Sequence, residues 1–248
     1  MLELDNISLN FGQHQALRGV GLSISQGAQI ALIGPSGSGK SSLLKVIATE
    51  YQPDSGTLSF DGKDPSSLNR RQLKELRQSV SYIPQHLALI PNLSVAQNIL
   101  LGEVGKQHTF QTLKNLLIPN KQKLERIHSL LHEVGIPEKL FHRTDTLSGG
   151  QQQRVAIARA LYQEAKIILA DEPVSAVDPT RAHSLLDCLT GVAHAHDLTL
   201  ICSLHNLAYA KRFFPTMVGM RNGSTSHKGA SNGFTDEDFE ALYSLEHG

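Results

Sequence analysis

The spacing of apolar and polar residues divides the chain into strand-like and helix-like stretches. The first stretch, LELDNISLNF, alternates the two kinds, which is typical of a strand with one buried face. LRGVGLSI follows after the turn-forming GQHQ, so the two strands are expected to pair as an antiparallel unit. QIALIG and KIILADE are continuous apolar runs, the pattern of strands that are covered on both faces of a parallel sheet.

Shorter stretches extend this alternation of strands and helices along the chain. The predicted strands are TLSFDG, SVSYIP, LTLICSLH and TMVGM, and the predicted helices are SSLLKVIA, DPTRAHSLLDCLTGVA, NLAYAKRF and, at the end, FTDEDFEALYSL. The spacing is helical, with few strand signals, in SVAQNILL, TFQTLKNLLI and KLERIHSLLHEVGI. These three segments predict a helical insertion.

The alternation predicts an α/β fold with a mainly parallel sheet, an N-terminal antiparallel β subdomain and an inserted helical subdomain. We expect one domain over residues 1–248, with its core at 1–85 and 164–222. The helical subdomain is expected at 86–163 and a short C-terminal tail at 223–248.

Composition narrows the function classes. The 248 residues include 23 Lys+Arg and 23 Asp+Glu, so no overall positive charge favours nucleic acid. The N-terminus lacks the pattern of a signal peptide, and no apolar stretch is long enough to span a bilayer. We therefore expect a cytoplasmic protein that meets a membrane only through a partner. Cys188 and Cys202 have no metal or disulfide spacing and are expected to be buried free thiols.

GPSGSGKS, residues 34–41, matches the P-loop pattern between a predicted strand and a helix. Gly34, Gly37 and Gly39 allow the backbone to close around an anion, with the helix N-terminus adding partial positive charge. Lys40 is expected to reach the β- and γ-phosphates of a nucleotide, and the Ser41 hydroxyl to ligate Mg²⁺. The alternative is an ordinary glycine-rich turn with a chance lysine, but the strand and helix on either side favour the phosphate cradle.

Two acids follow the apolar strand IILADE. Asp171 is the candidate ligand of Mg²⁺, and Glu172 is the candidate base that polarises the attacking water. Gln85 follows another strand and is expected to reach the metal and the water, while His205 is expected to touch the γ-phosphate. Taken alone, the acids fit a solvated strand exit, and Gln85 and His205 fit ordinary polar residues at the edge of the core.

A second glycine turn, LSGGQ at 147–151, precedes the helical pattern QQQRVAIARAL. Ser148 is a candidate helix cap, and Gly149 and Gly150 expose backbone N–H groups where the helix dipole favours an anion. A plain capped helix start has the same local pattern, so these residues alone leave both interpretations open.

Taken together, the motifs resemble those of the nucleotide-binding subunit of an ABC transporter. GPSGSGKSS resembles its Walker A motif, IILADE its Walker B, LSGGQ its signature and SAVD at 175–178 its D-loop. Gln85 and His205 stand at its Q-loop and switch-histidine positions. The resemblance implies a RecA-like P-loop NTPase core that hydrolyses ATP with Mg²⁺ held by Ser41, Gln85 and Asp171, and with Glu172, His205 and Gln85 as catalytic residues.

The resemblance also implies which residues bind the nucleotide. Phe11 stands where the family places an aromatic ring that stacks on adenine. The phosphates are expected to be bound by Gly34, Pro35, Ser36, Gly37, Ser38, Gly39, Lys40, Ser41 and Ser42. In this family two copies stack head to tail, so Ser148, Gly149, Gly150 and Gln151 are expected to bind the nucleotide of a second, identical subunit.

The partners implied by the resemblance are transmembrane permease subunits, with the chain peripheral on the cytoplasmic face of the plasma membrane. Their contact is expected near Gln85 and the segment HLALIPNLSVAQNILLG. QHLALIPNLSVAQNILLGEVGK looks like the importer class, which implies an extracytoplasmic solute-binding protein as a further partner. The long insert before LSGGQQQRVAIARAL and the segment LHNLAYAKRF are similar to phosphonate importer ATPases, whereas FFPTMVGMRNG and IATEYQPDSG depart from them.

Three alternatives remain open. One is an ABC exporter or lipoprotein-release ATPase, since cargo is selected by other subunits. Another is a soluble ABC ATPase acting on DNA or ribosomes, but one cassette without heptads and with balanced charge fits this poorly. A monomeric P-loop kinase is the third, and it would not need LSGGQ.

Overall fold

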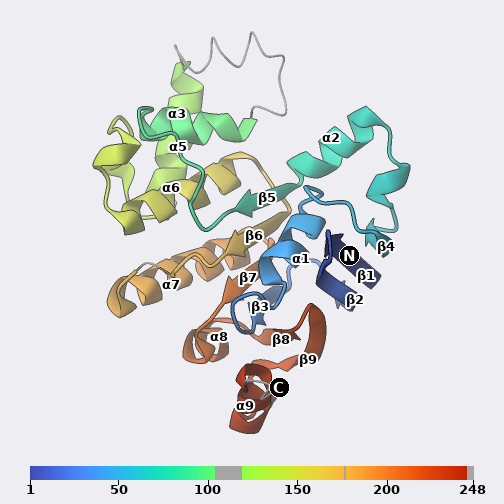
Figure 1. Ribbon diagram of the computed structural model, residues 1–248. Helices are drawn as coiled ribbons and strands as arrows, with labels where there is room; N and C mark the ends of the chain where they lie inside the picture. Colours follow the sequence, from blue (N-terminus) through green and yellow to red (C-terminus); the bar gives the residue numbers. More distant parts are fainter. Residues whose placement is uncertain (104–118, 176, 245–248) are drawn as a thin grey trace.

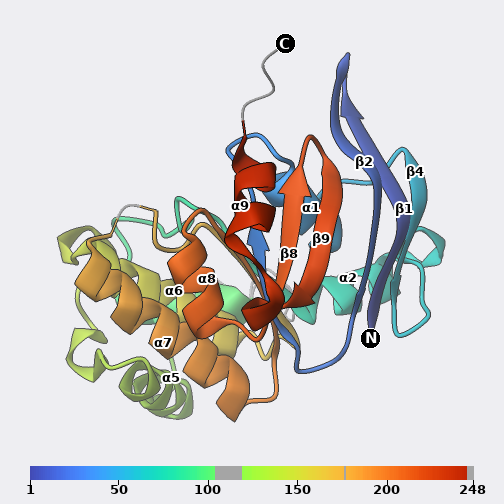
Figure 2. The same ribbon diagram turned by 90° about the horizontal axis from the view of Figure 1, so that it is seen from below.

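The computed structural model describes residues 1–103, 119–175 and 177–244. A small N-terminal sheet lies at one side of the molecule, helices α5 (Lys121–Glu133), α6 (Gly149–Tyr162) and α7 (Pro179–Ala195) lie at the other, and the main sheet lies between them (Figures 1 and 2).

The N-terminal sheet has the strand order β2-β1-β4, with antiparallel pairing throughout. Its strands are β1 (Leu2–Phe11), β2 (His14–Ile24) and β4 (Ser55–Phe60). Leu2 and Leu4 pair with Ile24 and Leu22 of β2, and all four side chains are buried. The predicted antiparallel subdomain is therefore confirmed, with its apolar alternate positions facing the core.

The main sheet has the order β5-β6-β7-β3-β8-β9. Its strands are β5 (Val80–Ile83), β6 (Ile167–Asp171), β7 (Thr199–Leu204), β3 (Gln29–Ile33), β8 (Thr216–Arg221) and β9 (Ser224–Ala230). All neighbours are parallel except β8 and β9. The mainly parallel sheet is confirmed, and its carboxyl edge is where P-loop proteins bind their ligands.

The two faces of the main sheet bury separate apolar cores. Along β3, Ile30 and Leu32 face one core and Ala31 and Ile33 face the other. The first core is shared with the N-terminal sheet and with α1 (Lys40–Ile47). The second is shared with α3 (Val95–Leu100), α5, α6, α7 and α8 (Leu207–Phe213). Burial on both faces explains why β3, β6 and β7 are continuous apolar runs.

The helical insertion is formed by α3, α5, α6 and short 3₁₀ turns at Leu101–Glu103, Pro137–Lys139 and Thr144–Thr146. The helix predicted at TFQTLKNLLI lies outside the described residues. The terminal helix is confirmed as α9 (Asp236–Tyr243), which Thr235 caps. The division into a core at 1–85 and 164–222, a subdomain at 86–163 and a tail at 223–248 stays a prediction.

Two elements were not predicted from sequence. Helix α2 (Arg70–Gln78) is largely polar, and its only clear signal is the capping box of Asn69 and Gln72. Strand β9, STSHKGA, has almost no apolar residues because it lies at the sheet edge, and it continues the main sheet into the segment that was expected to be a tail. Over the described ranges, none of the helices has the length and apolar character needed to cross a bilayer.

Candidate nucleotide site

The loop between β3 and α1 requires glycine at two points of close backbone contact. Gly34 has φ of 152°, and a Cβ atom there would lie 2.1 Å from the carbonyl oxygen of Met220. Gly39 has φ of 101°, and a Cβ atom there would lie 2.7 Å from the carbonyl oxygen of Ala16. The loop can wrap tightly over the start of α1 only because these two side chains are missing.

Lys40, the first residue of α1, is 4% exposed. Its ammonium donates to the carbonyl oxygens of Gly34 at 2.8 Å and Pro35 at 2.9 Å. Burial lowers the pKa of Lys40, while the carboxylates of Glu172 and Asp171 act in the opposite direction. The Lys40 ammonium therefore lies beneath the loop, and a bound phosphate chain would contact the same loop.

Asp171, at the carboxyl end of β6, is 5% exposed and accepts three hydrogen bonds. Its Oδ1 accepts from the hydroxyl of Ser41 at 3.0 Å and from that of Ser203 at 2.7 Å. Its Oδ2 accepts from the Tyr82 hydroxyl at 3.0 Å. Burial, with the nearby Asp171 charge, raises the pKa of Tyr82 well above its ordinary value, so Tyr82 remains a donor. The structure thus brings together Ser41 and Asp171, the two residues expected to share a metal.

Glu172 contacts two other predicted residues, His205 and Gln85. Its backbone has φ of 48°, and its N–H donates to Ser203 Oγ at 2.8 Å. One carboxylate oxygen pairs with His205 Nε2, and the other accepts from Gln85 Nε2 at 3.2 Å. Gln85 also donates to Ser175 Oγ at 3.2 Å. Gln85, Glu172 and His205 therefore meet at the carboxyl edge of the sheet.

A cavity of about 180 Å³ connects the loop with Phe11. Its lining comprises Phe11, His14, Ala16, Gly37, Ser38, Gly39, Lys40, Ser41, Ser42 and Glu172. Phe11 is 46% exposed, so much of its ring is available to a ligand. This lining suits a nucleotide. The aromatic ring can contact the base, the glycine-rich loop can bind the phosphates, and the carboxylate can contact the attacking water.

The second glycine turn lies elsewhere. Ser148 caps α6 by accepting from the Gln151 N–H, and the Gln151 side chain accepts from the Ser148 N–H. Helix α6 lies with α3 and α5, whereas α1 lies nearer the middle of the molecule (Figure 1). None of residues 148–151 is among the described residues that line the cavity at Phe11.

Two residues that donate hydrogen bonds to Asp171 were not predicted. Tyr82 and Ser203 stand inside apolar strands, where a single hydroxyl is easily taken for a chance polar residue. Ser203 is paired with Asp171 in the parallel register of β6 and β7, which sequence alone does not specify. Their signal is position, because Tyr82 lies three residues before Gln85 and Ser203 two residues before His205.

These features define a P-loop ATPase whose second glycine turn lies apart from its own phosphate loop. Residues 17–175 match the family model described as ABC transporter, and the chain belongs to that family. It is an ATP-binding and ATP-hydrolysing cassette, and cassettes of this family act as dimers with transmembrane permeases.

The chain is similar to curated proteins over nearly its whole length. The phosphonates import ATP-binding protein PhnC of Pseudomonas putida is 42% identical over 245 residues, spanning 99% of this chain and 90% of that protein. The dimeric structure of MJ0796, a bacterial ABC transporter cassette, matches with a TM-score of 0.81 and 28% identity. A dimeric post-hydrolysis state of the same cassette, bound to ADP and Pi, matches with a TM-score of 0.76 and 28% identity. Both matches cover 94% of this chain and 100% of the other.

Proposed function

We propose that this cassette powers an importer of phosphonate-type anions. The observation that supports this most is the 42% identity to a phosphonates import ATP-binding protein over 99% of the chain. That similarity includes the C-terminal segment with β9 and α9, well beyond the residues 17–175 of the general family model. The cargo itself is selected by other subunits, so the similarity indicates the kind of transporter to which the cassette belongs.

The oxygen atoms of Ser41 and Asp171 fit a bound Mg²⁺. They lie 3.0 Å apart at the carboxyl edge of the sheet, and hydroxyl and carboxylate oxygens are the ligands that this hard cation prefers. Gln85 adds an amide oxygen beside the nitrogen that contacts Glu172. Mg²⁺ supplies charge neutralisation of the β- and γ-phosphates. Ser41, Asp171 and Gln85 are its proposed ligands.

Glu172 is the proposed general base. Its carboxylate accepts a proton from water as the water oxygen attacks the γ-phosphorus, and the bond to the β-phosphate oxygen breaks to release ADP. His205 contacts one carboxylate oxygen of Glu172, and Gln85 donates to the other. We assign His205 to the γ-phosphate, and the Gly34–Ser42 segment with Lys40 to the phosphate chain.

The start of α6 is proposed to bind the nucleotide of a second, identical subunit. Its first turn contains no acidic residue, so the N–H groups of Gly149 and Gly150 and the helix dipole meet no negative charge within the helix. Residues 148–151 do not line the cavity at Phe11, which supports assigning an anion at this turn to the nucleotide of another molecule. A γ-phosphate shared in this way holds two subunits together until hydrolysis.

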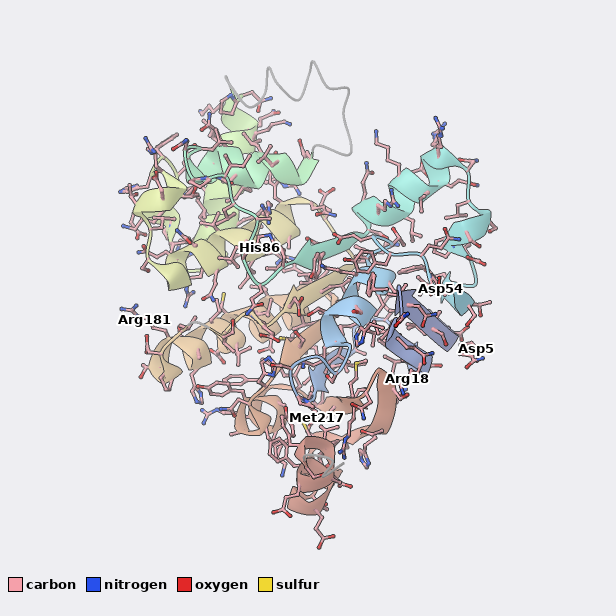
Figure 3. The ribbon with its side chains drawn as sticks, in the orientation of Figure 1. Asp5, Arg18, Asp54, His86, Arg181 and Met217 are labelled. Atoms are coloured by element: carbon pink, nitrogen blue, oxygen red, sulfur yellow. The ribbon has the colours of Figure 1, made fainter. Side chains whose placement is uncertain are left out.

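The permease contact is proposed at two neighbouring loops of the helical subdomain, on the cytoplasmic face of the membrane. Ile90 and Phe141 are 44% and 71% exposed, which is unusual for large apolar side chains. Backbone hydrogen bonds from Val95 to His142 and from Thr144 to Leu93 hold the two loops side by side. His86 follows Gln85 in the chain and lies between the helical subdomain and β5 (Figure 3). Movement of the segment at His86 would therefore be passed to Gln85 and the catalytic cluster.

Reconstitution tests the whole proposal. The cassette would be purified with its permease in lipid nanodiscs, and ATP hydrolysis measured with an extracytoplasmic binding protein loaded with 2-aminoethylphosphonate, inorganic phosphate or sulfate. We expect the phosphonate-loaded protein to stimulate hydrolysis most. Equal stimulation by all three, or none, would contradict the cargo, and a Phe141→Asp variant with normal ATP binding should lose the permease.

A further inference from the structure

The segment that follows α1, TEYQPD, departs from the resemblance noted in the sequence and is not used by the proposed hydrolysis. We propose that Tyr51 in this segment is a positioning residue for the nucleotide base, holding the Phe11 ring at a fixed place over the phosphate loop. This inference rests on the proposed function, with adenine stacked on Phe11 as the resemblance to the family implies.

The first observation is a direct contact between the two rings. The ring centres of Phe11 and Tyr51 lie 5.3 Å apart with an angle of 72° between the ring planes, the edge-to-face geometry that aromatic pairs prefer. Phe11 lines the cavity that contains the phosphate loop, whereas Tyr51 is not among the described residues that line it and lines another cavity, with Val46 and Pro53. Tyr51 therefore contacts the Phe11 ring from outside this cavity, and 46% of Phe11 stays exposed for the base.

A second contact fastens the end of β1 to the same segment. Asp54 Oδ2 accepts from the Asn10 backbone N–H at 2.6 Å and from Asn10 Nδ2 at 3.1 Å. The Asp54 N–H in turn donates to the Ser8 carbonyl oxygen at 2.9 Å. Asp54 lies close to β1 in Figure 3. Because Asn10 directly precedes Phe11, these bonds limit how far the ring can move.

The segment is also fixed to α1 and α2. The backbone N–H groups of Glu50 and Tyr51 donate to the Lys45 carbonyl oxygen at 2.9 Å and 3.2 Å. The Lys45 ammonium lies 5.3 Å from the centre of the Tyr51 ring. Arg77 of α2 donates to the carbonyl oxygen of Thr49 at 3.0 Å and to its hydroxyl at 2.9 Å.

These contacts connect the base site to the phosphate site through one rigid element. Helix α1 begins at Lys40 in the phosphate loop, and the segment after its end contacts Phe11. The separation between ring and loop is thus set by α1 and Tyr51 together with the packing of Ala16 in β2 against Gly39. A ring held in advance at this separation costs less entropy when the base stacks on it.

The test separates binding of the base from binding of the phosphates. Tyr51→Ala and Tyr51→Phe would be titrated by calorimetry with ATP and with inorganic tripolyphosphate, which has no base. We expect Tyr51→Ala to weaken ATP binding by about 2- to 10-fold, the range given by the loss of one aromatic pair. Tripolyphosphate binding should be unchanged, and Tyr51→Phe, which keeps the ring, should bind ATP like the parent chain. Gln52→Ala is the matched control, since Gln52 is the exposed neighbour of Tyr51.

Phe11→Ala and the double variant with Tyr51→Ala complete the cycle. The inference requires that Tyr51→Ala has no further effect on ATP binding once Phe11 is gone. Equal loss of ATP and tripolyphosphate binding in Tyr51→Ala would overturn it, because that result indicates damage to the phosphate loop. If Phe11→Ala weakens ATP binding and Tyr51→Ala does not, the inference fails and the base site stands. If Phe11→Ala has no effect, the base site itself is wrong, and this inference falls with it.

Discussion

The Ser203 hydroxyl lies 2.7 Å from Asp171 Oδ1 and is completely buried. Ser203 Oγ in turn accepts a hydrogen bond from the backbone N–H of Glu172 at 2.8 Å. One side chain of β7 therefore fixes both acids at the end of β6, and it stands two residues before His205. This single hydroxyl therefore fixes the position of Asp171, the proposed metal ligand, relative to Glu172, the proposed base, and to the loop that contains His205.

Ser203→Ala should therefore lower both stability and activity. The variant leaves the Glu172 N–H without its partner and removes one donor to Asp171, which costs about 1–3 kcal/mol in the free energy of unfolding. We expect a lower kcat for ATP hydrolysis with a smaller change in KM, since the loop that binds the phosphates is intact. Ser231→Ala is the control, because Ser231 is another buried serine and its hydroxyl donates to the carbonyl oxygen of Phe214, which is not a residue of the site. Equal loss of kcat in the two variants would show that stability alone is responsible.

Glu172→Gln should keep ATP binding and stop turnover. The amide cannot accept the proton of water, and loss of one well-placed transition-state group costs about 10²–10³ in rate. With ATP bound and not hydrolysed, the dimer should persist, which light scattering with and without ATP would detect. Hydrolysis at the parent rate would show that Glu172 is not the base.

Lys40→Ala should abolish hydrolysis and weaken ATP binding, because the variant removes the only cation placed beneath the phosphate loop among the described residues that line the cavity at Phe11. Calorimetry and a phosphate-release assay measure the two effects separately. Binding of ATP at the parent affinity would contradict the place given to Lys40.

Ser148→Arg should leave ATP binding by a single subunit unchanged and prevent ATP-dependent dimerisation. The arginine occupies the turn that would receive the neighbour's γ-phosphate, and it replaces the oxygen that caps α6. The readout is mass by light scattering in a background of Glu172→Gln. A stable dimer in the double variant would contradict nucleotide binding across the interface by this turn.

The sequence pattern was sufficient to predict a strand wherever one face or both faces of that strand are buried along its whole length. Strand β1 alternates because one face is buried, and β3, β6 and β7 have largely apolar interiors because both faces are buried. The phosphate loop was equally clear, since its glycines and Lys40 have fixed spacing. Strand β9 was missed because an edge strand buries little, and α2 because its exposed surface leaves hardly any apolar period.

The contacts that complete the site depend on register, which the residue types do not reveal. Ser203 meets Asp171 only because β6 and β7 pair as Asp171 with Ser203, and a shift by one residue would turn the hydroxyl to the other face. Likewise, Tyr51 reaches Phe11 through the geometry of the turn after α1, where Thr49 has a positive φ of 57°. Such contacts between distant segments are properties of the folded chain.

Arg159→Ala should uncouple α6, the helix that Ser148 caps, from the segment after Gln85. The Arg159 guanidinium donates to the carbonyl oxygens of Ala88 at 2.8 Å and Leu87 at 2.7 Å, two residues with positive φ of 47° and 60°. Burial lowers the pKa of Arg159, yet a guanidinium stays charged at any physiological pH.

The expected cost of Arg159→Ala is about 1.5–3 kcal/mol in the free energy of unfolding, because the partly buried Leu87 carbonyl and the exposed Ala88 carbonyl lose a charged donor. Arg159→Lys should recover only part of it, since an ammonium cannot present two parallel N–H groups to both oxygens. The matched control is Arg71→Ala, whose exposed pair with Glu75 is worth at most about 0.5 kcal/mol. Thermal unfolding measures the stability, and hydrolysis with and without the permease measures the coupling. Full stimulation by the permease in a folded Arg159→Ala variant would show that the contact supports the loop without transmitting its movement.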